Sequence, residues 1–351
     1  MIFVIDQILG KFSHDLGIDL GTANTLVFVR GKGIVIREPS IVAQHRKTKK
    51  IIAIGTSAKR MIGRTPATIE AVRPLKDGVV SDFDTTSAML SYFVNKVHSR
   101  PGSHLTMARP RVIIGVPAQI SDIERRAVLE AARAAGARSA YLIEEPMAAA
   151  IGADLPVSEP VGSMIIDIGG GTCEIAVISL SGIVVGRSLK LAGDAMNRDI
   201  TSYIRARYGL GIGEATAEEI KISLGSATPF VVEKEMVIRG RDLERGLPKS
   251  VRLASSGVRE AITGTIAAIV EAVRDVINDT PPELAADIAE RGIILCGGGS
   301  QISGLAKLIS GETKMPVSVA TDALNCVVLG CAKLFENPTL LKKVSIAKIS
   351  S

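Results

Sequence analysis

The chain of 351 residues contains no tryptophan, and aromatic side chains make up only 3% of it. Proteins that bind single-stranded nucleic acid stack the bases on aromatic rings, so this composition offers little for such a platform. Apolar residues make up 46% and charged residues 22%, which is typical of a globular protein with a large aliphatic core. The length is sufficient for about two domains.

Cysteine and histidine are also scarce. Four cysteines (173, 296, 326 and 331) show neither a C-x-x-C pair nor the density of a disulfide framework, which favours a reducing compartment such as the cytosol. The four histidines have no metal-ligand spacing, so we expect no metal centre held by His or Cys. The chain has no apolar run of about 18 residues, the length a spanning helix needs, and no signal-peptide pattern at its N-terminus.

The net charge of +6 is spread along the chain. Its densest basic run, HRKTKK at 45–50, could contact the phosphate of a nucleic acid or lipid, or form the solvated tip of a hairpin. The hairpin tip is the favoured interpretation, and we expect no nucleic-acid partner.

The first twelve residues, MIFVIDQILGKF, are strongly apolar. On a helix most of the apolar side chains share one stripe, which is typical of an anchor lying in a membrane surface. The alternative is a segment that packs onto the protein's own core; alone in water so short a helix is marginal. The candidate membrane-contacting residues are Ile2, Phe3, Ile5, Ile8, Leu9 and Phe12.

Strand and helix patterns alternate along the chain, which predicts a mainly parallel sheet covered by helices. Ser121 and Glu124 form a capping box at the start of one helix, and Pro146 stands in the first turn of another. We expect strands at 33–43, 50–55 and 111–117, and helices at 57–63, 84–98, 121–136, 194–209 and 216–225.

The stretch GIDLGTANTLVFV at 17–29 returns as IIDIGGGTCEIAVIS at 165–179, which indicates an internal duplication. Each copy ends an apolar strand in an Asp followed by a glycine turn. Glycines let backbone N–H groups approach phosphate oxygens, and Asp19 and Asp167 would hold Mg²⁺ largely through water. In a third turn, CGGGS at 296–300, the backbone could pass close to a flat ligand such as adenine. The sequence contains neither a Walker A motif nor a dinucleotide-binding fingerprint.

These motifs resemble the superfamily of actin, sugar kinases and DnaK-type chaperones, and within it the MreB family of bacterial actins. The likeness runs from Asp15 to about Leu340. It implies an actin-like (ribonuclease H-like) α/β fold with duplicated domains, a nucleotide cleft between them and two small inserted subdomains. The implied parts are an N-terminal anchor (1–14), subdomain IA (15–42, 76–159 and 329–351), IB (43–75), IIA (160–194 and 259–328) and IIB (195–258).

The resemblance also implies a role for each site residue. Glu145 would position the attacking water, whereas Glu144 would point away. Leu105 and Met107, in a loop at 99–108, would be a second membrane contact, although scattered exposed apolar residues are normal. Cys173 departs from the family, which usually has Thr there. The ATP-binding residues would be Gly21, Thr22, Ala23, Asn24 and Thr25, then Gly169, Gly170, Gly171 and Thr172, then Glu218 and Lys221 near the ribose and base, and Gly297, Gly298, Gly299 and Ser300 at the adenosine.

The function that the resemblance implies is a cytoskeletal Mg-dependent ATPase that forms head-to-tail filaments, paired in antiparallel fashion, on the inner face of the cytoplasmic membrane. There it would organise cell-wall elongation with membrane proteins of that machinery. A DnaK-type chaperone is disfavoured because its substrate domain would have to follow about residue 345, where only KKVSIAKISS remains. A sugar kinase is disfavoured because no further acidic motif marks a sugar site. The motifs do not distinguish ATP from GTP.

Overall fold

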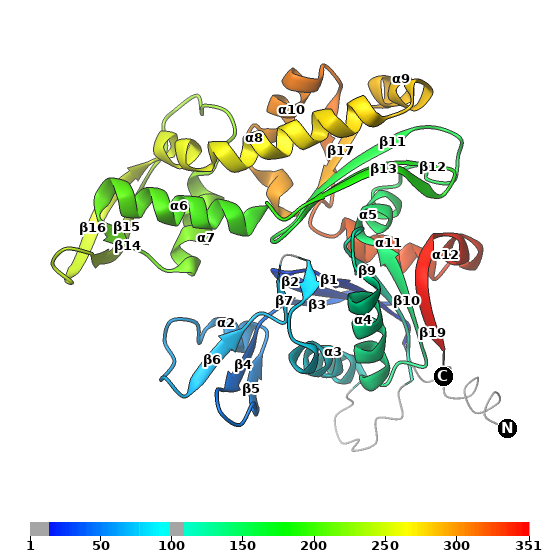
Figure 1. Cartoon of the computed structure of the whole chain (residues 1–351), viewed down its shortest axis with the longest axis horizontal. Coiled ribbons are helices and arrows are strands. Elements are labelled where there is room, and N and C mark those ends of the chain that lie inside the picture. The colour runs from blue at the N-terminus through cyan, green and yellow to red at the C-terminus, as the bar shows by residue number, and fades with distance from the viewer. Residues whose placement is uncertain (1–13, 77, 99–108, 351) are drawn as a thin grey trace. The chain divides into compact units, whose positions relative to one another are not determined.

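The computed structural model describes residues 14–76, 78–98 and 109–350 (Figure 1). The chain forms two compact units. Unit 1 comprises residues 1–161, 178–184 and 324–351, and unit 2 comprises 162–177 and 185–323. The finer division into an anchor and four subdomains stays a prediction.

Unit 1 is built on a mixed sheet with the strand order β19-β10-β9-β1-β2-β3. Strands β1, β9 and β10 run parallel, so their carboxyl ends meet at one edge. The strands are β1 (Leu16–Leu20), β2 (Asn24–Val29), β3 (Gly33–Pro39), β9 (Arg111–Val116), β10 (Ser139–Glu144) and β19 (Ser345–Ser350). The helices are α3 (Phe83–His98), α4 (Asp122–Ala134), α5 (Glu145–Gly152), α11 (Cys326–Leu334) and α12 (Pro338–Val344).

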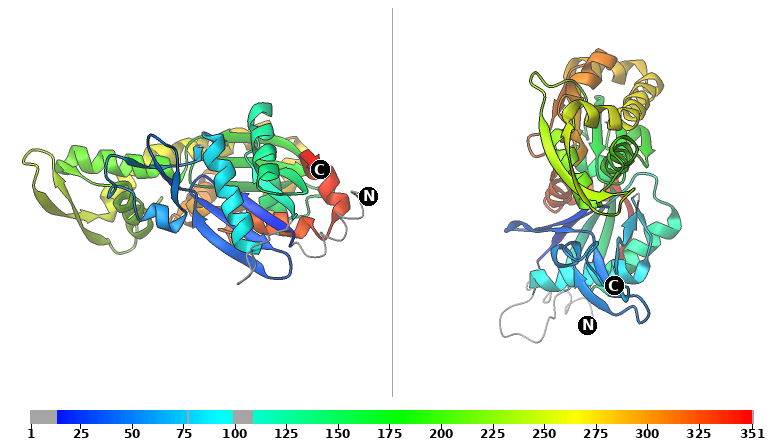
Figure 2. Two further views of the ribbon diagram at one scale, coloured as in Figure 1. Left: turned by 90° about the horizontal axis from the view of Figure 1, so that it is seen from below. Right: turned by 90° about the vertical axis from the view of Figure 1, so that its left-hand side faces the viewer.

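Side chains along β1 point alternately to the two faces of this sheet, and different helices cover each face. Leu16, Ile18 and Leu20 point into a core that they share with α3 and α4, which lie side by side (Figures 1 and 2). Gly17 points the other way, where a Cβ atom would lie 3.2 Å from the Cβ of Cys331 in α11. Asp19 has the same parity and therefore lies on the α11 face.

A smaller sheet of unit 1 has the order β5-β4-β6. Our expectation of one strand over 33–43 was wrong, because the chain turns at Ser40 between β3 and β4. Ser40 donates its backbone N–H to the Ala23 carbonyl (3.0 Å) and its hydroxyl to the Gly21 carbonyl (2.6 Å). Its elements are β4 (Val42–His45), β5 (Ile51–Ile54), α2 (Thr56–Lys59) and β6 (Ile69–Val72), and β7 (Leu75–Lys76) and β8 (Val79–Val80) pair as a separate two-stranded sheet.

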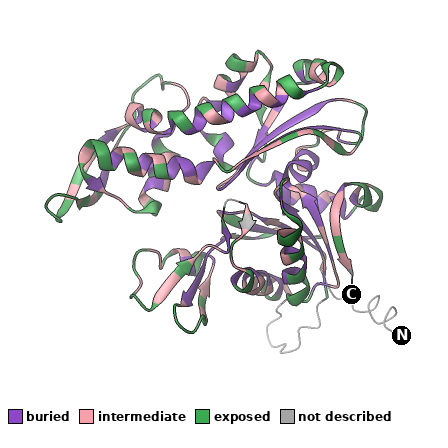
Figure 3. Ribbon diagram, in the orientation of Figure 1, coloured by how far each residue is buried: buried purple, intermediate pink, exposed green. Residues whose placement is uncertain are grey.

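Unit 2 is built on a sheet with the order β13-β12-β11-β17-β18, and a separate sheet has the order β14-β15-β16. Strand β11 is buried along its whole length (Figure 3). The turn between β12 and β13 falls in residues 178–184, which group with unit 1. The strands are β11 (Ser163–Ile168), β12 (Cys173–Ser179), β13 (Gly182–Leu189), β14 (Leu210–Gly211), β15 (Glu235–Asp242), β16 (Pro248–Ala254), β17 (Ile293–Cys296) and β18 (Val317–Val319). The helices are α6 (Gly193–Tyr208), α7 (Glu214–Leu224), α8 (Ser255–Asp279), α9 (Pro282–Arg291), η1 (Gly298–Gln301) and α10 (Leu305–Thr313).

Several local expectations are confirmed. The capping box of α4 forms through Ser121 and Glu124, and α5 has Pro146 in its first turn. The basic run 45–50 begins at the last residue of β4 and forms the turn between β4 and β5. The expected helix at 57–63 is instead the short α2, which ends at Lys59. Within the described residues, no helix combines the length and apolar character needed to cross a bilayer.

Helices α5 and α11 approach each other through glycines. A Cβ atom on Gly330 would lie 1.8 Å from the Ala148 carbonyl oxygen, and one on Gly152 would lie 1.9 Å from that of Cys326. We expect Gly330→Ala to lower the free energy of unfolding by about 2 kcal/mol or more, since the backbones must separate to admit a methyl group.

The control is Gly264→Ala in the middle of α8, where a Cβ atom would meet open space. That change should raise the free energy of unfolding by about 0.5–1 kcal/mol, because alanine favours helix more than glycine does. Urea denaturation followed by circular dichroism measures both. A Gly330→Ala protein as stable as the parent would contradict this account of the helix contact.

Candidate nucleotide site

In unit 1 the first duplicated hairpin is held by close backbone contacts. Asp19 is the penultimate residue of β1, and the turn at 21–23 leads into β2. A Cβ atom on Gly21 would lie 2.7 Å from the Asn24 carbonyl oxygen and 3.5 Å from Oδ1 of Asp19. Only glycine therefore fits at this position beside the carboxylate.

Side-chain hydroxyl groups hold this turn in place through hydrogen bonds. The hydroxyls of Thr25 and Ser40, both fully buried, hydrogen-bond at 2.8 Å, and Thr22 Oγ1 accepts from the Gly78 N–H at 3.1 Å. The two threonines that we expected to serve a phosphate thus also hold the hairpin itself. Ser40 was missed by the sequence analysis, because nothing local to 33–43 shows that its hydroxyl reaches Gly21.

Glu145 begins α5 directly after β10, at the same strand edge as Asp19, and is 8% exposed. Gly115 pairs in register with Asp19, and a Cβ atom on it would lie 3.6 Å from Cγ of Glu145 and 2.6 Å from Val327 of α11. Gly115, also missed from sequence, therefore leaves the space that the Glu145 side chain and α11 occupy.

The thiol of Cys331 in α11 indicates where the carboxylates of Asp19 and Glu145 lie. Burial raises the pKa of this thiol, and the negative charges of Asp19 and Glu145 raise that pKa further. Both carboxylates therefore lie near this thiol, on the α11 face of the sheet. Burial raises the pKa of Glu144, which the charge of Arg125 in α4 opposes. Glu144 thus lies toward the α4 face, as we expected.

In unit 2 the second duplicated strand packs directly against the third glycine turn. Strands β11 and β17 are parallel and pair Asp167 with Cys296, so the turns that follow them share one edge. Gly297 has φ 77°, a conformation that glycine adopts readily, and a Cβ atom there would lie 2.3 Å from Oδ1 of Asp167. Ser300 closes this turn by donating its hydroxyl to the Gly297 carbonyl at 2.7 Å.

Asp167 is 7% exposed, and burial raises its pKa to about 6, while a hydrogen bond with Cys296 acts in the opposite direction. Burial also raises the pKa of Cys173 well above its usual value, with further contributions from the charges of Asp167 and Glu174. A carboxylate held in this environment gains from a cation or from N–H donors that arrive with a ligand.

The second glycine loop is braced by the start of α6. Gly169 donates its N–H to the Thr172 carbonyl (2.9 Å), while the Gly170 carbonyl accepts from the N–H of Asp194 (2.7 Å). Gly193 donates to the Gly169 carbonyl at 3.2 Å, and Lys221 of α7 donates its ammonium group to the Gly193 carbonyl at 2.9 Å. Glu218, three residues before Lys221, shares its helix face. Gly193 and Asp194 are further residues that sequence analysis missed; a glycine directly before an amphipathic helix was the available signal.

Each unit thus brings together its own share of the expected residues. Unit 1 gathers Asp19, Gly21–Thr25 and Glu145, and unit 2 gathers Asp167, Gly169–Thr172, Lys221 and Gly297–Ser300. The expected membrane residues of 1–12, together with Leu105 and Met107, lie outside the described residues.

The carboxylates of the two duplicated hairpins fit Mg²⁺ that is bound mainly by water and ligand oxygens. In the part of the chain that the structure describes, no group of three or more His, Cys, Asp or Glu side chains could hold a metal ion. Magnesium commonly keeps several waters and binds through one or two carboxylates and substrate phosphates. Asp19 in unit 1 and Asp167 in unit 2 are each a carboxylate of the kind that binds magnesium in this way.

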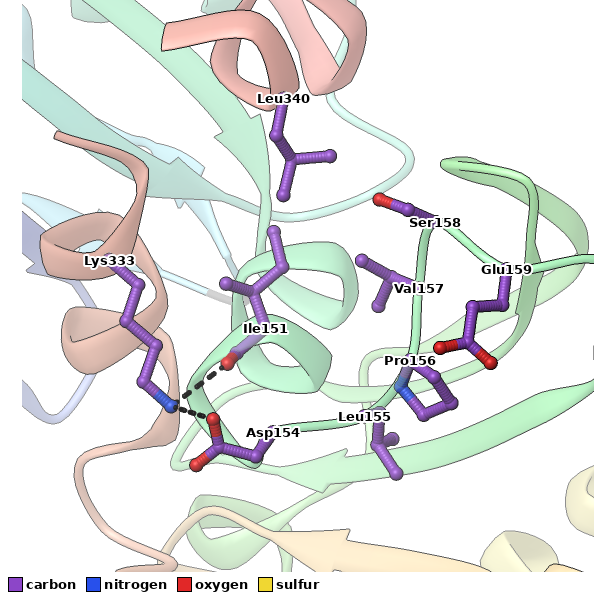
Figure 4. A pocket seen from close by; sticks show the side chains of 9 residues that line it. All are labelled: Ile151, Asp154, Leu155, Pro156, Val157, Ser158, Glu159, Lys333 and Leu340. Carbon is purple, nitrogen blue, oxygen red and sulfur yellow. Dashed lines mark hydrogen bonds and ion pairs between the residues drawn. The ribbon is translucent and has the colours of Figure 1, made fainter. Parts of the chain in front are cut away.

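A pocket of about 260 Å³ in unit 1 is lined by other residues (Figure 4). Its wall is the loop after α5, with Leu155, Pro156 and Val157, and Leu340 of α12 lies across from it. Lys333 pairs with Asp154 at 2.7 Å at its margin and donates to the Ile151 carbonyl. The pocket contains none of the expected nucleotide-binding residues.

We expect Asp167→Asn to remove a pH-dependent loss of stability. Because the folded pKa of Asp167 is raised from 3.8 to about 6, its contribution to stability is fully present below 3.8 and is lost as the pH rises through about 6. The parent should lose roughly 1–2 kcal/mol of unfolding free energy from this group between about pH 5 and pH 8, and the variant should not.

Urea denaturation of nucleotide-free protein at the two pH values measures the difference. Glu290→Gln, an exposed change on α9 of the same unit, is the control and should follow the parent. Parallel pH profiles for the parent and Asp167→Asn would show that burial of this carboxyl group is not destabilising.

Comparison with known proteins identifies the family. The family model described as MreB/Mbl protein matches residues 13–343. The cell shape-determining protein MreB of Escherichia coli (strain K12) is 50% identical over 337 residues, which cover 95% of this chain and 96% of that protein.

Two crystal structures of MreB5 of Spiroplasma citri, each 37% identical, cover 95% of this chain and 98% of their own. The one bound to ADP has a TM-score of 0.88, and the one bound to AMPPNP has 0.87. The resemblance and fold expected from the sequence are therefore confirmed. This chain has the actin-like fold and belongs to the MreB/Mbl family.

Proposed function

We propose that this protein is an ATP-dependent, membrane-associated filament protein that organises cell-wall elongation and maintains rod cell shape. ATP binding and hydrolysis control its polymerisation. The observation that carries the proposal is the Asp-glycine hairpin repeated in both units of a chain of this family, around Asp19 and Asp167. The names of relatives as cell shape-determining proteins and the nucleotides bound to MreB5 support it.

In this proposal the two half-sites together bind one ATP. Backbone N–H groups of 21–25 and 169–172 approach the phosphates, and the start of α6 adds the positive end of a helix dipole behind the second loop. The turn at 297–300 contacts the adenosine, and Glu218 and Lys221 lie toward the ribose and base. Two tight contacts support this assignment, because Gly21 and Gly297 have no room for a side chain.

Hydrolysis of the γ-phosphate needs little covalent chemistry from the protein. We assign to Glu145 the task of orienting the attacking water, since it is a buried carboxylate at the same strand edge as Asp19. A bound Mg²⁺ supplies charge neutralisation at the phosphates. Asp19 and Asp167 would hold that ion, largely through water.

The proposed polymer grows head to tail, because a heterologous contact whose rotation does not close produces an open filament. Protofilaments pair in antiparallel fashion, and hydrolysis weakens them. The apolar stripe of residues 1–12 binds the inner face of the cytoplasmic membrane, where membrane proteins of the elongation machinery are the partners. Many weak anchors on one polymer add by avidity.

We expect Glu145→Ala to lower the rate of phosphate release while ATP affinity stays within a few-fold, because the water loses its orienting group but the phosphate loops are intact. The parent should sediment at high speed with Mg-ATP and stay in solution with ADP. The variant should sediment with Mg-ATP and dissolve more slowly.

Glu144→Ala is the matched control, since the neighbouring carboxylate lies toward the α4 face. It should keep the parent's rate of phosphate release. If Glu144→Ala stops turnover and Glu145→Ala does not, the water belongs to Glu144. A parent protein that never sediments with Mg-ATP would contradict the filament proposal itself.

Deletion of residues 1–12 should abolish binding to liposomes while sedimentation with Mg-ATP persists, because the anchor lies outside the nucleotide-binding residues. Co-flotation with vesicles made from bacterial lipid extract measures the binding. A truncated protein that still floats as the parent does would reject the anchor.

A further inference from the structure

Three arginines gather around one carboxylate at the amino-terminal edge of the unit 1 sheet. Asp15, just before β1, pairs with Arg111 at 2.7 Å, Arg138 at 3.5 Å and Arg30 at 4.0 Å. We call these four residues the Asp15 arginine cluster. Three guanidinium groups share one carboxylate, so the cluster carries an excess of positive charge.

The backbone fixes the cluster in place. Arg111 begins β9, Arg138 precedes β10, and Arg30 follows β2, whose antiparallel course brings its end beside the start of β1. Arg111 also lies over the ring of Phe335, with 5.0 Å between the guanidinium carbon and the ring centroid. Arg30 is the most accessible, with 53% of its side chain exposed, against 23% for Arg111 and 29% for Arg138.

The described residues that flank both expected membrane-contacting segments lie at this edge. Residues 1–13 are followed by His14, which precedes Asp15. Residues 99–108 stand between His98, the end of α3, and Arg109, two residues before β9. The His14 N–H donates to Nε2 of His98 at 3.3 Å, which brings the two attachment points together.

We propose that the Asp15 arginine cluster binds the phosphate of anionic phospholipid headgroups. The inference rests on the membrane association proposed above and adds the lipid class to it. A single apolar anchor holds a membrane only marginally, whereas an apolar anchor and a basic patch together give stable binding. Guanidinium groups suit phosphate because their planar donors match its oxygens.

The test measures partitioning of the full-length, nucleotide-free protein onto two kinds of vesicle. One is phosphatidylcholine alone, and the other contains phosphatidylglycerol as well. We expect Arg30→Gln to weaken binding to the anionic vesicles about fivefold, the effect of one charge near an anionic surface, and to leave binding to neutral vesicles unchanged. Arg30→Lys should bind as the parent does, and added salt should reduce the difference.

Arg126→Gln is the matched control, because Arg126 is also an exposed arginine of unit 1 but lies on α4. It should bind both vesicles as the parent does. Asp15→Asn separates recognition from a structural role: it should strengthen binding to the anionic vesicles, since one negative charge is lost. A purely structural Asp15 would instead weaken binding to both vesicles.

The outcomes distinguish the two proposals. Equal binding of parent and Arg30→Gln to the anionic vesicles overturns the arginine cluster and leaves the apolar anchor standing. An equal loss on neutral and anionic vesicles also overturns it, because the change would then act through the fold. If the parent binds neither vesicle, the membrane proposal fails and the lipid site fails with it.

Discussion

The close packing of neighbouring groups against glycines at the carboxyl ends of parallel strands is the constraint on which the rest depends. Gly115 admits α11 and the Glu145 side chain beside Asp19, and Gly297 lies against Asp167 and Ile168. At each position a methyl group would meet another atom at well under 3 Å. Since the carboxylates end buried strands, these contacts place polar groups at the rim of an apolar core, where backbone N–H groups are available to a ligand.

Burial of a carboxylate at the proposed binding site lowers the stability of the fold. Asp167 pairs with a strand residue on one side and lies under a glycine turn, so its charged form is poorly solvated and its pKa rises to about 6. A structure selected for stability alone would place an apolar or neutral residue there. The large aliphatic cores of the two units offset this cost, since strand β11 is buried throughout and Leu16 and Ile18 are almost wholly buried.

The sheet of unit 1 presents different chemistry at its two ends. Its carboxyl edge holds Asp19 and Glu145 near the first glycine turn, while its amino edge holds the Asp15 arginine cluster. Parallel strands make this separation possible, because the same ends of β1, β9 and β10 always meet at the same edge. One rigid sheet can therefore carry a nucleotide half-site and a basic surface without either disturbing the other.

The sequence by itself determined what depends on neighbours along the chain. The duplicated hairpins, the capping box at Ser121 and the helix start at Pro146 follow from local spacing, and they were enough to indicate the family and most of the expected site. Only the tertiary structure decided which distant groups complete each half-site. Ser40 reaches Gly21, and Gly193 reaches Gly169, because separate elements pack together. The Asp15 arginine cluster likewise joins residues from four strand ends, and no local pattern records a contact across that separation in sequence.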